Sequence, residues 1–241
     1  VFGDWSSDVC SSDLATRPWA LLDPTFPRQL QQQLGLRMIS AIRSARHGGT
    51  ILLLRRELAL DRDNLQRYVR IKYPFQTGEP QVRARTLMLR AMNVLAESCG
   101  DTHPPPQTVG WKEYVCATDP RVAATDDAMT ELTRFTASLA MVDGAVVLTH
   151  ALEAIGFGAE ISGELPEVEM VGRVVDLETQ QVEFEPATLM GTRHRSAYRF
   201  CRALPGSVAL VVSQDSGLRV VSCVNNQVLC WEQLSAGVFD V

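Results

Sequence analysis

The sequence changes character at one stretch, Ala140-Met-Val-Asp-Gly-Ala-Val-Val-Leu148, where a helical pattern gives way to an apolar run. Before this stretch apolar residues recur at helical spacing, and after it short apolar runs alternate with turn residues. The earlier pattern predicts helices over 28–46, 58–73, 82–98 and 126–141, with one strand over 50–54. The later pattern predicts strands over 145–148, 154–161, 170–177, 208–213, 218–224 and 227–231, with a short helix over 193–204.

This order of helices and strands predicts an α/β fold class, with a central mixed β-sheet flanked by helices. We divide the chain into a helical N-terminal part, 15–125, which contains the opening helix and strand, and a strand-rich core, 126–241. Three consecutive prolines predict a loop over 101–106, and the segment 180–189 is an insertion without a predicted shape.

The first residues have a different origin from the rest. Residues 4–14 read Asp-Trp-Ser-Ser-Asp-Val-Cys-Ser-Ser-Asp-Leu, which looks like the translation of a sequencing adapter. We therefore treat 1–14 as an adapter-derived scar and exclude it from fold reasoning, against the alternative of a natural polar N-terminus. The native N-terminus then lies elsewhere, and an upstream domain could precede it.

Composition restricts the partners and the compartment. The formal charge of −5 includes three aspartates of the scar, so the remainder carries −2, and we expect no nucleic-acid or membrane partner. The longest apolar stretch, 137–159, is interrupted by polar residues and is not a membrane span. The five cysteines outside the scar are scattered and odd in number, which is typical of reduced thiols in a cytoplasmic protein.

A second motif, Gly191-Thr-Arg-His-Arg195, stands directly before the predicted helix over 193–204. Thr192 is a natural N-cap, and the free N–H groups of a helix N-terminus attract an anion. Arg193, His194 and Arg195 would add fixed donors and positive charge. The plain alternative is a capped surface helix with a solvated basic turn. Likewise, Asp143-Gly144-Ala145 taken alone is more typical of an Asp-Gly turn leading into a buried strand.

Three stretches together resemble one family. In order they are Ala140–Leu148 as quoted above, Gly191-Thr-Arg-His-Arg-Ser-Ala197, and Val208-Ala-Leu-Val-Val-Ser-Gln214. They are similar to the diadenylate cyclase domain, which joins two ATP molecules into cyclic di-AMP. The resemblance covers roughly residues 30–235, and residues 37–54 are similar to the helix and strand that open such a domain.

The resemblance implies a site and a reaction. Asp143 would be catalytic and would bind Mg²⁺ or Mn²⁺, while Gly144 and Ala145 would let a nucleotide approach the backbone. ATP would be bound by residues of the second motif and by the serine that ends the third stretch: Gly191, Thr192, Arg193, His194, Arg195, Ser196 and Ser213, of which Arg193 and His194 would also be catalytic. Residues 126–241 would form the nucleotide-binding catalytic core, acting as at least a homodimer.

The chain departs from the family pattern in four places. Val142 stands where some relatives have a metal-binding histidine, and Gln214 stands where many have an acidic residue. The segments 56–125 and 163–190 enlarge the compact domain. These departures keep open a catalytically silent domain that senses ATP or cyclic di-AMP. A nucleic-acid-binding protein using the arginine-rich N-terminal helices is a further alternative, which the mild acidity disfavours.

Overall fold

The computed structural model describes residues 20–44, 48–76, 78–99, 107–175, 181–213 and 217–232; the predicted scar over 1–14, the predicted loop over 101–106 and Gln214 lie outside them. The helices are α1 (Phe26–Ser44), α2 (Arg56–Leu60), α3 (Arg62–Leu65), α4 (Glu79–Cys99), α5 (Trp111–Cys116), α6 (Pro120–Ala140), the 3₁₀ helix η2 (Ala187–Leu189) and α7 (Thr192–Ala203). The strands are β1 (Ala20–Leu22), β2 (Gly49–Leu54), β3 (Val69–Pro74), β4 (Gln107–Val109), β5 (Ala145–Thr149), β6 (Ala154–Ile161), β7 (Met170–Val174), β8 (Val182–Pro186), β9 (Val208–Ser213), β10 (Gly217–Val224) and β11 (Gln227–Glu232).

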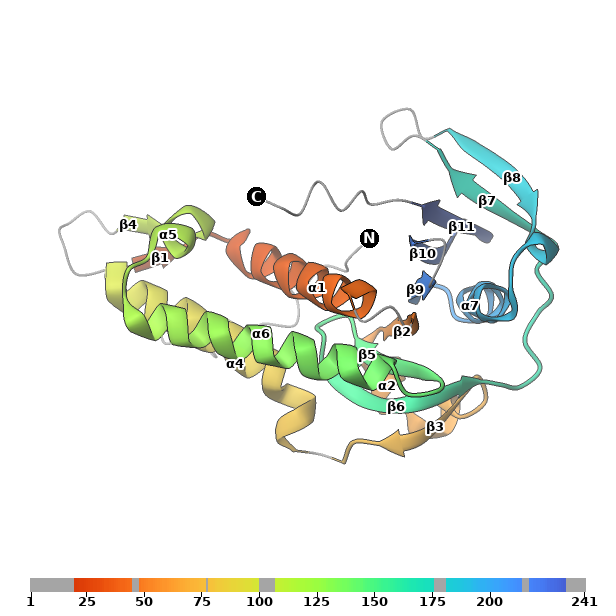
Figure 1. Cartoon of the computed structure of the whole chain (residues 1–241), viewed down its shortest axis with the longest axis horizontal. Helices are drawn as coiled ribbons and strands as arrows, with labels where there is room; N and C mark the ends of the chain where they lie inside the picture. The colour runs from red at the N-terminus through yellow and green to blue at the C-terminus, as the bar shows by residue number, and fades with distance from the viewer. Residues whose placement is uncertain are drawn as a thin grey trace.

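Nine of these strands form one mixed sheet in the order β3-β6-β5-β2-β9-β10-β11-β7-β8 (Figure 1). In its centre, β2 pairs with β5 in parallel and with β9 in antiparallel. β1 and β4 form a separate parallel pair. Helices pack on both faces of the large sheet, so the predicted α/β class with a central mixed sheet flanked by helices is confirmed.

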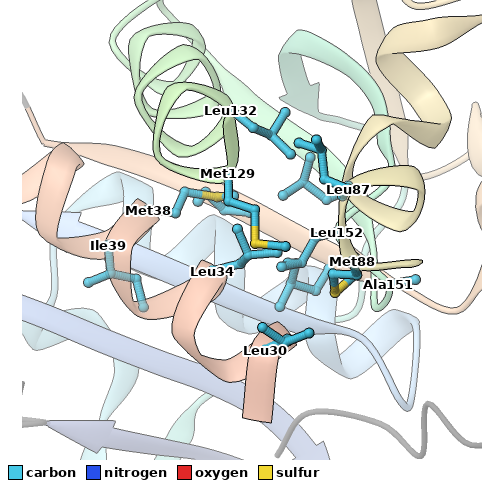
Figure 2. Close-up of a cluster of buried hydrophobic side chains, with 14 of the residues drawn as sticks. Leu30, Leu34, Met38, Ile39, Leu87, Met88, Met129, Leu132, Ala151 and Leu152 are labelled. Carbon is cyan, nitrogen blue, oxygen red and sulfur yellow. The ribbon is translucent and has the colours of Figure 1, made fainter. Parts of the chain in front are cut away.

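The three long helices α1, α4 and α6 cover one face of the sheet. Alternate side chains of the central strands, such as Ile51 and Val146, point into this layer because successive residues of a strand face opposite sides. In Figure 2 Met38 of α1, Met88 of α4 and Met129 of α6 gather in the cluster that these helices form, and all three are buried. In the part of the chain that the structure describes, no helix is long and apolar enough to cross a membrane.

The opposite face carries α7 together with the short helices α2 and α3. Tyr198 and Phe200 of α7 are fully buried here against the other set of alternating strand residues, such as Leu52 and Val211. The amphipathic helix α7 therefore lies over the strands β9 and β10, with which it makes most of its contacts.

One predicted helix is wrong. Residues 58–73 form the end of α2, the single turn α3 and then the strand β3. The Asp61 carboxylate accepts a hydrogen bond from the backbone N–H of Asn64 at 3.2 Å, which starts a new helix where a continuous one was expected. After α3, Val69 and Ile71 alternate with polar residues and pair with β6, so strand pairing overrides the apparent helical spacing.

Other boundaries differ less. α6 begins six residues earlier than predicted, because Asp119 caps it and Pro120 occupies its first turn. The segment without a predicted shape forms β8 and η2, and β7 ends at Val174. β1, β4 and α5 were not predicted.

The two predicted parts of the chain share one sheet. β2 and β3 come from the N-terminal part, 15–125, and they pair with β5, β6 and β9 of the core, 126–241. Residue 126, the predicted start of the core, lies inside α6. The helices α1 and α4 of the N-terminal part, together with α6, thus supply one layer of the hydrophobic core.

Candidate functional site

The sheet brings the sequence motifs to one edge. Ala145 of β5 pairs with Thr50 of β2, Thr50 pairs with Val211 of β9, and Val211 pairs with Arg219 of β10, which defines a line across four strands. β5 begins on this line, at Ala145, and β9 ends two residues beyond it, at Ser213. Asp143 and Ser213 therefore lie at the same edge of the sheet, and two strand spacings of about 4.8 Å separate β5 from β9.

The second motif reaches the same end of the sheet on the face that α7 covers. The C-terminal end of α7 is joined to the start of β9 by a short turn. The N-terminal end of α7 therefore lies toward the end of β9. Arg219, on the line defined above, has its Nη1 3.3 Å from the hydroxyl of Tyr198 and also contacts the sulfur of Met190. These contacts place the start of α7 over β10, at the same end of the sheet as Asp143 and Ser213.

Asp143 is exposed at this edge, three residues beyond the end of α6. Its carboxylate makes no hydrogen bond or ion pair with the residues that the structure describes. The side chain is therefore accessible from solvent, and its binding of a metal ion stays a prediction.

Gly144 and Ala145 have packing reasons for their small size. Gly144 has a φ of +107°, and a Cβ there would lie 2.6 Å from the carbonyl carbon of Gly158 in β6. Ala145 is buried in the core layer beneath α7. The close approach of β5 and β6 accounts for both residues, and their predicted contact with a nucleotide stays a prediction.

The N-terminus of α7 is open. Its N-cap residue is Gly191, and no side chain caps the helix, so the prediction that Thr192 is the N-cap is wrong. Thr192 is instead the first helical residue. A Cβ added to Gly191 would meet none of the described atoms within 4 Å. Because Gly191 has a φ of −65°, neither its backbone conformation nor its packing requires glycine.

The side chains of the first turn divide between solvent and interior. Thr192, Arg193 and Arg195 are exposed, Ser196 is half-buried, and neither arginine forms an ion pair with a described residue. Two unpaired guanidinium groups thus flank an uncapped helix N-terminus, where the helix dipole also favours negative charge.

His194 points inward instead. Its side chain is only 8% exposed, its ring centroid lies 6.5 Å from that of Tyr198, and its Nε2 has no hydrogen-bond partner in the described part of the chain. Burial, followed by the positive charges of Arg219 and Arg193, lowers the pKa of His194. The imidazole is therefore neutral near pH 7 and keeps one buried nitrogen available.

A buried polar group beneath α7 was missed in the sequence. Arg219 of β10 forms an ion pair with Glu232 of β11, and both side chains lie on the face that α7 covers. Burial raises the pKa of the neighbouring Tyr198 to about 12, so its hydroxyl stays neutral. An arginine at an inward-facing position of the apolar run 218–224 was the available signal.

The remaining predicted residue, Ser213, is the last residue of β9 and is half-buried. As for a metal ion, the described residues hold no cluster of three or more His, Cys, Asp or Glu side chains. Among the predicted site residues, the single carboxylate is that of Asp143. One carboxylate fits Mg²⁺ only when substrate phosphates and water complete the coordination.

Comparison with known proteins adds no family assignment: no family model matches the chain, and no curated protein matches it. The resemblance to diadenylate cyclases therefore depends on the three motif stretches and on how the fold arranges them.

Proposed function

We propose that this chain is a diadenylate cyclase, which condenses two ATP molecules into cyclic di-AMP and pyrophosphate. The observation that carries the proposal is the convergence of two distant motifs at one sheet edge. Asp143 and the uncapped start of α7, residues 191–195, are almost fifty residues apart in sequence, yet Asp143 precedes β5 and Met190, just before α7, contacts Arg219 of β10 at the same end of the sheet. A solvated surface helix does not require an accessible carboxylate at the same end of the sheet.

In this proposal α7 binds the triphosphate. The free N–H groups of residues 192–194 and the helix dipole attract phosphate oxygens. Arg193 and Arg195 extend from the same turn and add charge-assisted hydrogen bonds. The unpartnered Nε2 of His194 gains a hydrogen bond if a phosphate or ribose oxygen reaches the first turn, which would remove the cost of burying it unpaired.

Asp143 serves the reacting centre. Each bond forms when the 3′-hydroxyl oxygen of one ATP attacks the α-phosphorus of the other, and the bond to the departing pyrophosphate breaks. When bound by Asp143 and phosphate oxygens, Mg²⁺ or Mn²⁺ would offset the charge that develops on the phosphates. The arginines of α7 hold the nucleotide in line, because positioning supplies much of the catalysis in such transfers.

Two such bonds close the ring, so two bound nucleotides must face each other. Each chain offers one α7 N-terminus and one Asp143, and Asp143, Arg193 and Arg195 are all exposed. A homodimer that joins two copies of this edge would provide both halves of the reaction.

The second candidate is a nucleotide-sensing domain that binds ATP or cyclic di-AMP without turnover. The specific observation in its favour is that Asp143 is the sole carboxylate that the described motif residues contribute. Sensing needs the anion site at α7 but not a metal-binding carboxylate.

The deciding experiment incubates the full chain with ATP and either Mn²⁺ or Mg²⁺ and detects cyclic di-AMP by mass spectrometry. Asp143→Asn should abolish product while ATP still binds, because the phosphate-binding turn is unchanged. Asp127→Asn, which alters another exposed aspartate on α6, is the matched control and should retain activity. Tight ATP binding by a dimer, without a linear or cyclic dinucleotide under either metal, would favour the sensor.

A further inference from the structure

A cavity lies between the single turn α3 and the outermost strand β3. Its volume is about 480 Å³, and Ile155 and Ser162, at either end of β6, complete its wall. β6 separates it from β5, the strand that Asp143 precedes. Pockets of roughly 300–1,000 Å³ are typical of small-molecule sites.

The inner wall of this cavity is apolar. Leu65 of α3, Val69 of β3 and Ile155 of β6 are buried, and Ile71 is half-buried. These aliphatic side chains can cover a short alkyl chain or a ring. These side chains offer no hydrogen bond to a bound molecule.

The polar residues of the cavity are mainly donors. Arg62, Gln66, Arg70 and Ser162 line it, and no carboxylate does. Nη2 of Arg62 donates to the carbonyl oxygen of Phe75 at 3.0 Å, which fixes this side chain between α3 and the end of β3. Neither arginine forms an ion pair with a described residue.

The nearest acids do not neutralise these arginines. The Asp61 carboxylate caps α3, as described above, and Asp63 is exposed on the same turn. Glu160 stands opposite Arg70 in the register of β3 and β6, but the two form no ion pair within 4 Å. The cavity therefore combines an apolar wall with the guanidinium of Arg62, which forms no ion pair with a described residue.

We infer that this cavity binds a small anion with an apolar body, either a monocarboxylate or a phosphate monoester. The body packs on the wall formed by Leu65, Val69 and Ile155, and the anionic head accepts hydrogen bonds from Arg62. This inference does not rest on the proposed function, because none of the predicted site residues, 143–145, 191–196 and 213, lines the cavity.

The test titrates the full ¹⁵N-labelled chain with hexanoate and with phenyl phosphate, followed by two-dimensional NMR. Hexanol and phenol are the neutral counterparts. At least one anion should shift the amides of α3 and β3, with an affinity about tenfold or more above that of its neutral counterpart. The tighter of the two anions identifies a carboxylate or a phosphate ligand. No shift with either anion overturns the inference.

Two variants localise the binding. Arg62→Gln should weaken the anion about tenfold, whereas Arg67→Gln, an exposed arginine outside the cavity, should leave it unchanged. Gln66→Trp should fill the cavity and abolish binding while keeping Arg62. Equal losses in Arg62→Gln and Arg67→Gln, or anion binding that survives Gln66→Trp, would overturn the inference. A tenfold loss of ATP affinity in Arg62→Gln would also overturn it, since the cavity would then belong to the nucleotide site.

Discussion

At the scale of single residues, the two motif glycines have opposite surroundings. Gly144 has a positive φ and touches the backbone of β6, whereas Gly191 has an ordinary φ and faces open space. The same substitution therefore has different expected effects at the two positions, one on stability and one on binding.

Gly144→Ala should destabilise the fold by about 2–4 kcal/mol, because it adds both a strained φ and a steric clash. Gly191→Ala should cost about 0.5–1 kcal/mol, since alanine is a poorer N-cap than glycine but meets no clash and no strained φ here. It should nevertheless weaken ATP about tenfold, the cost of one displaced charge-assisted hydrogen bond. Chemical denaturation and calorimetric titration measure these effects; unchanged ATP affinity in Gly191→Ala would argue against phosphate binding at α7.

The buried His194 should make the free energy of unfolding depend on pH. Its folded pKa lies below the ordinary value of 6.5, so the unfolded chain binds the proton more tightly. Stability is therefore fully present above pH 6.5 and declines as the pH falls toward the folded pKa. Urea unfolding at several values from about pH 7 to pH 5 should show this decline, and His194→Gln should reduce it. An identical slope in the variant would mean that His194 is not the group responsible.

At the scale of elements, the sequence predicted the pieces with a single strong periodicity. α1, α4, β6 and β9 appear close to their predicted bounds, because each has one apolar face or a continuous apolar run. β3 was missed since its pattern, Val69-Arg-Ile71, is too short to outweigh the preceding helical spacing. β8, with mostly exposed or half-buried side chains, depends on its pairing with β7 rather than on its own composition.

The helix α4 tests whether the enlarged segment 56–125 is part of the core. Met88 is fully buried between α4 and the other long helices, whereas Thr86 is exposed on the same helix. Met88→Ala should lower the free energy of unfolding by about 2–5 kcal/mol, because it removes buried methylenes and leaves a cavity. Thr86→Ala is the control and should change it by less than about 0.5 kcal/mol. A negligible effect of Met88→Ala would mean that α4 is an appendage.

At the scale of the whole molecule, the sequence could predict the candidate site residues but not everything that surrounds them. The motifs are visible because their polar residues interrupt apolar patterns. The ion pair of Arg219 with Glu232 was not predicted, because Glu232 lies one residue beyond the predicted strand over 227–231 and its partner depends on the exact register of the two strands. Asn225 and Asn226 both have positive φ, which aligns β10 with β11 and so brings the two charges together beneath α7.

The last prediction concerns assembly. If two copies of the sheet end that holds Asp143 and the start of α7 must face each other, the rate per chain should rise with protein concentration until the dimer is saturated, while ATP binding per chain stays constant.

Asp143→Asn chains should still fold and pair, so an excess of them should inhibit the wild type by forming mixed dimers that lack one of the two carboxylates. The control is an equal excess of a chain with Arg193→Gln, Arg195→Gln and Asp143→Asn combined, which binds nucleotide weakly but leaves protein-to-protein pairing testable by sedimentation. Cyclic di-AMP formation measured across the dilution series, with and without these chains, separates the cases. A rate per chain that is independent of concentration far below the measured dimer dissociation constant, and unaffected by excess Asp143→Asn chains, would show that a single copy closes the ring, and the dimeric mechanism would be wrong.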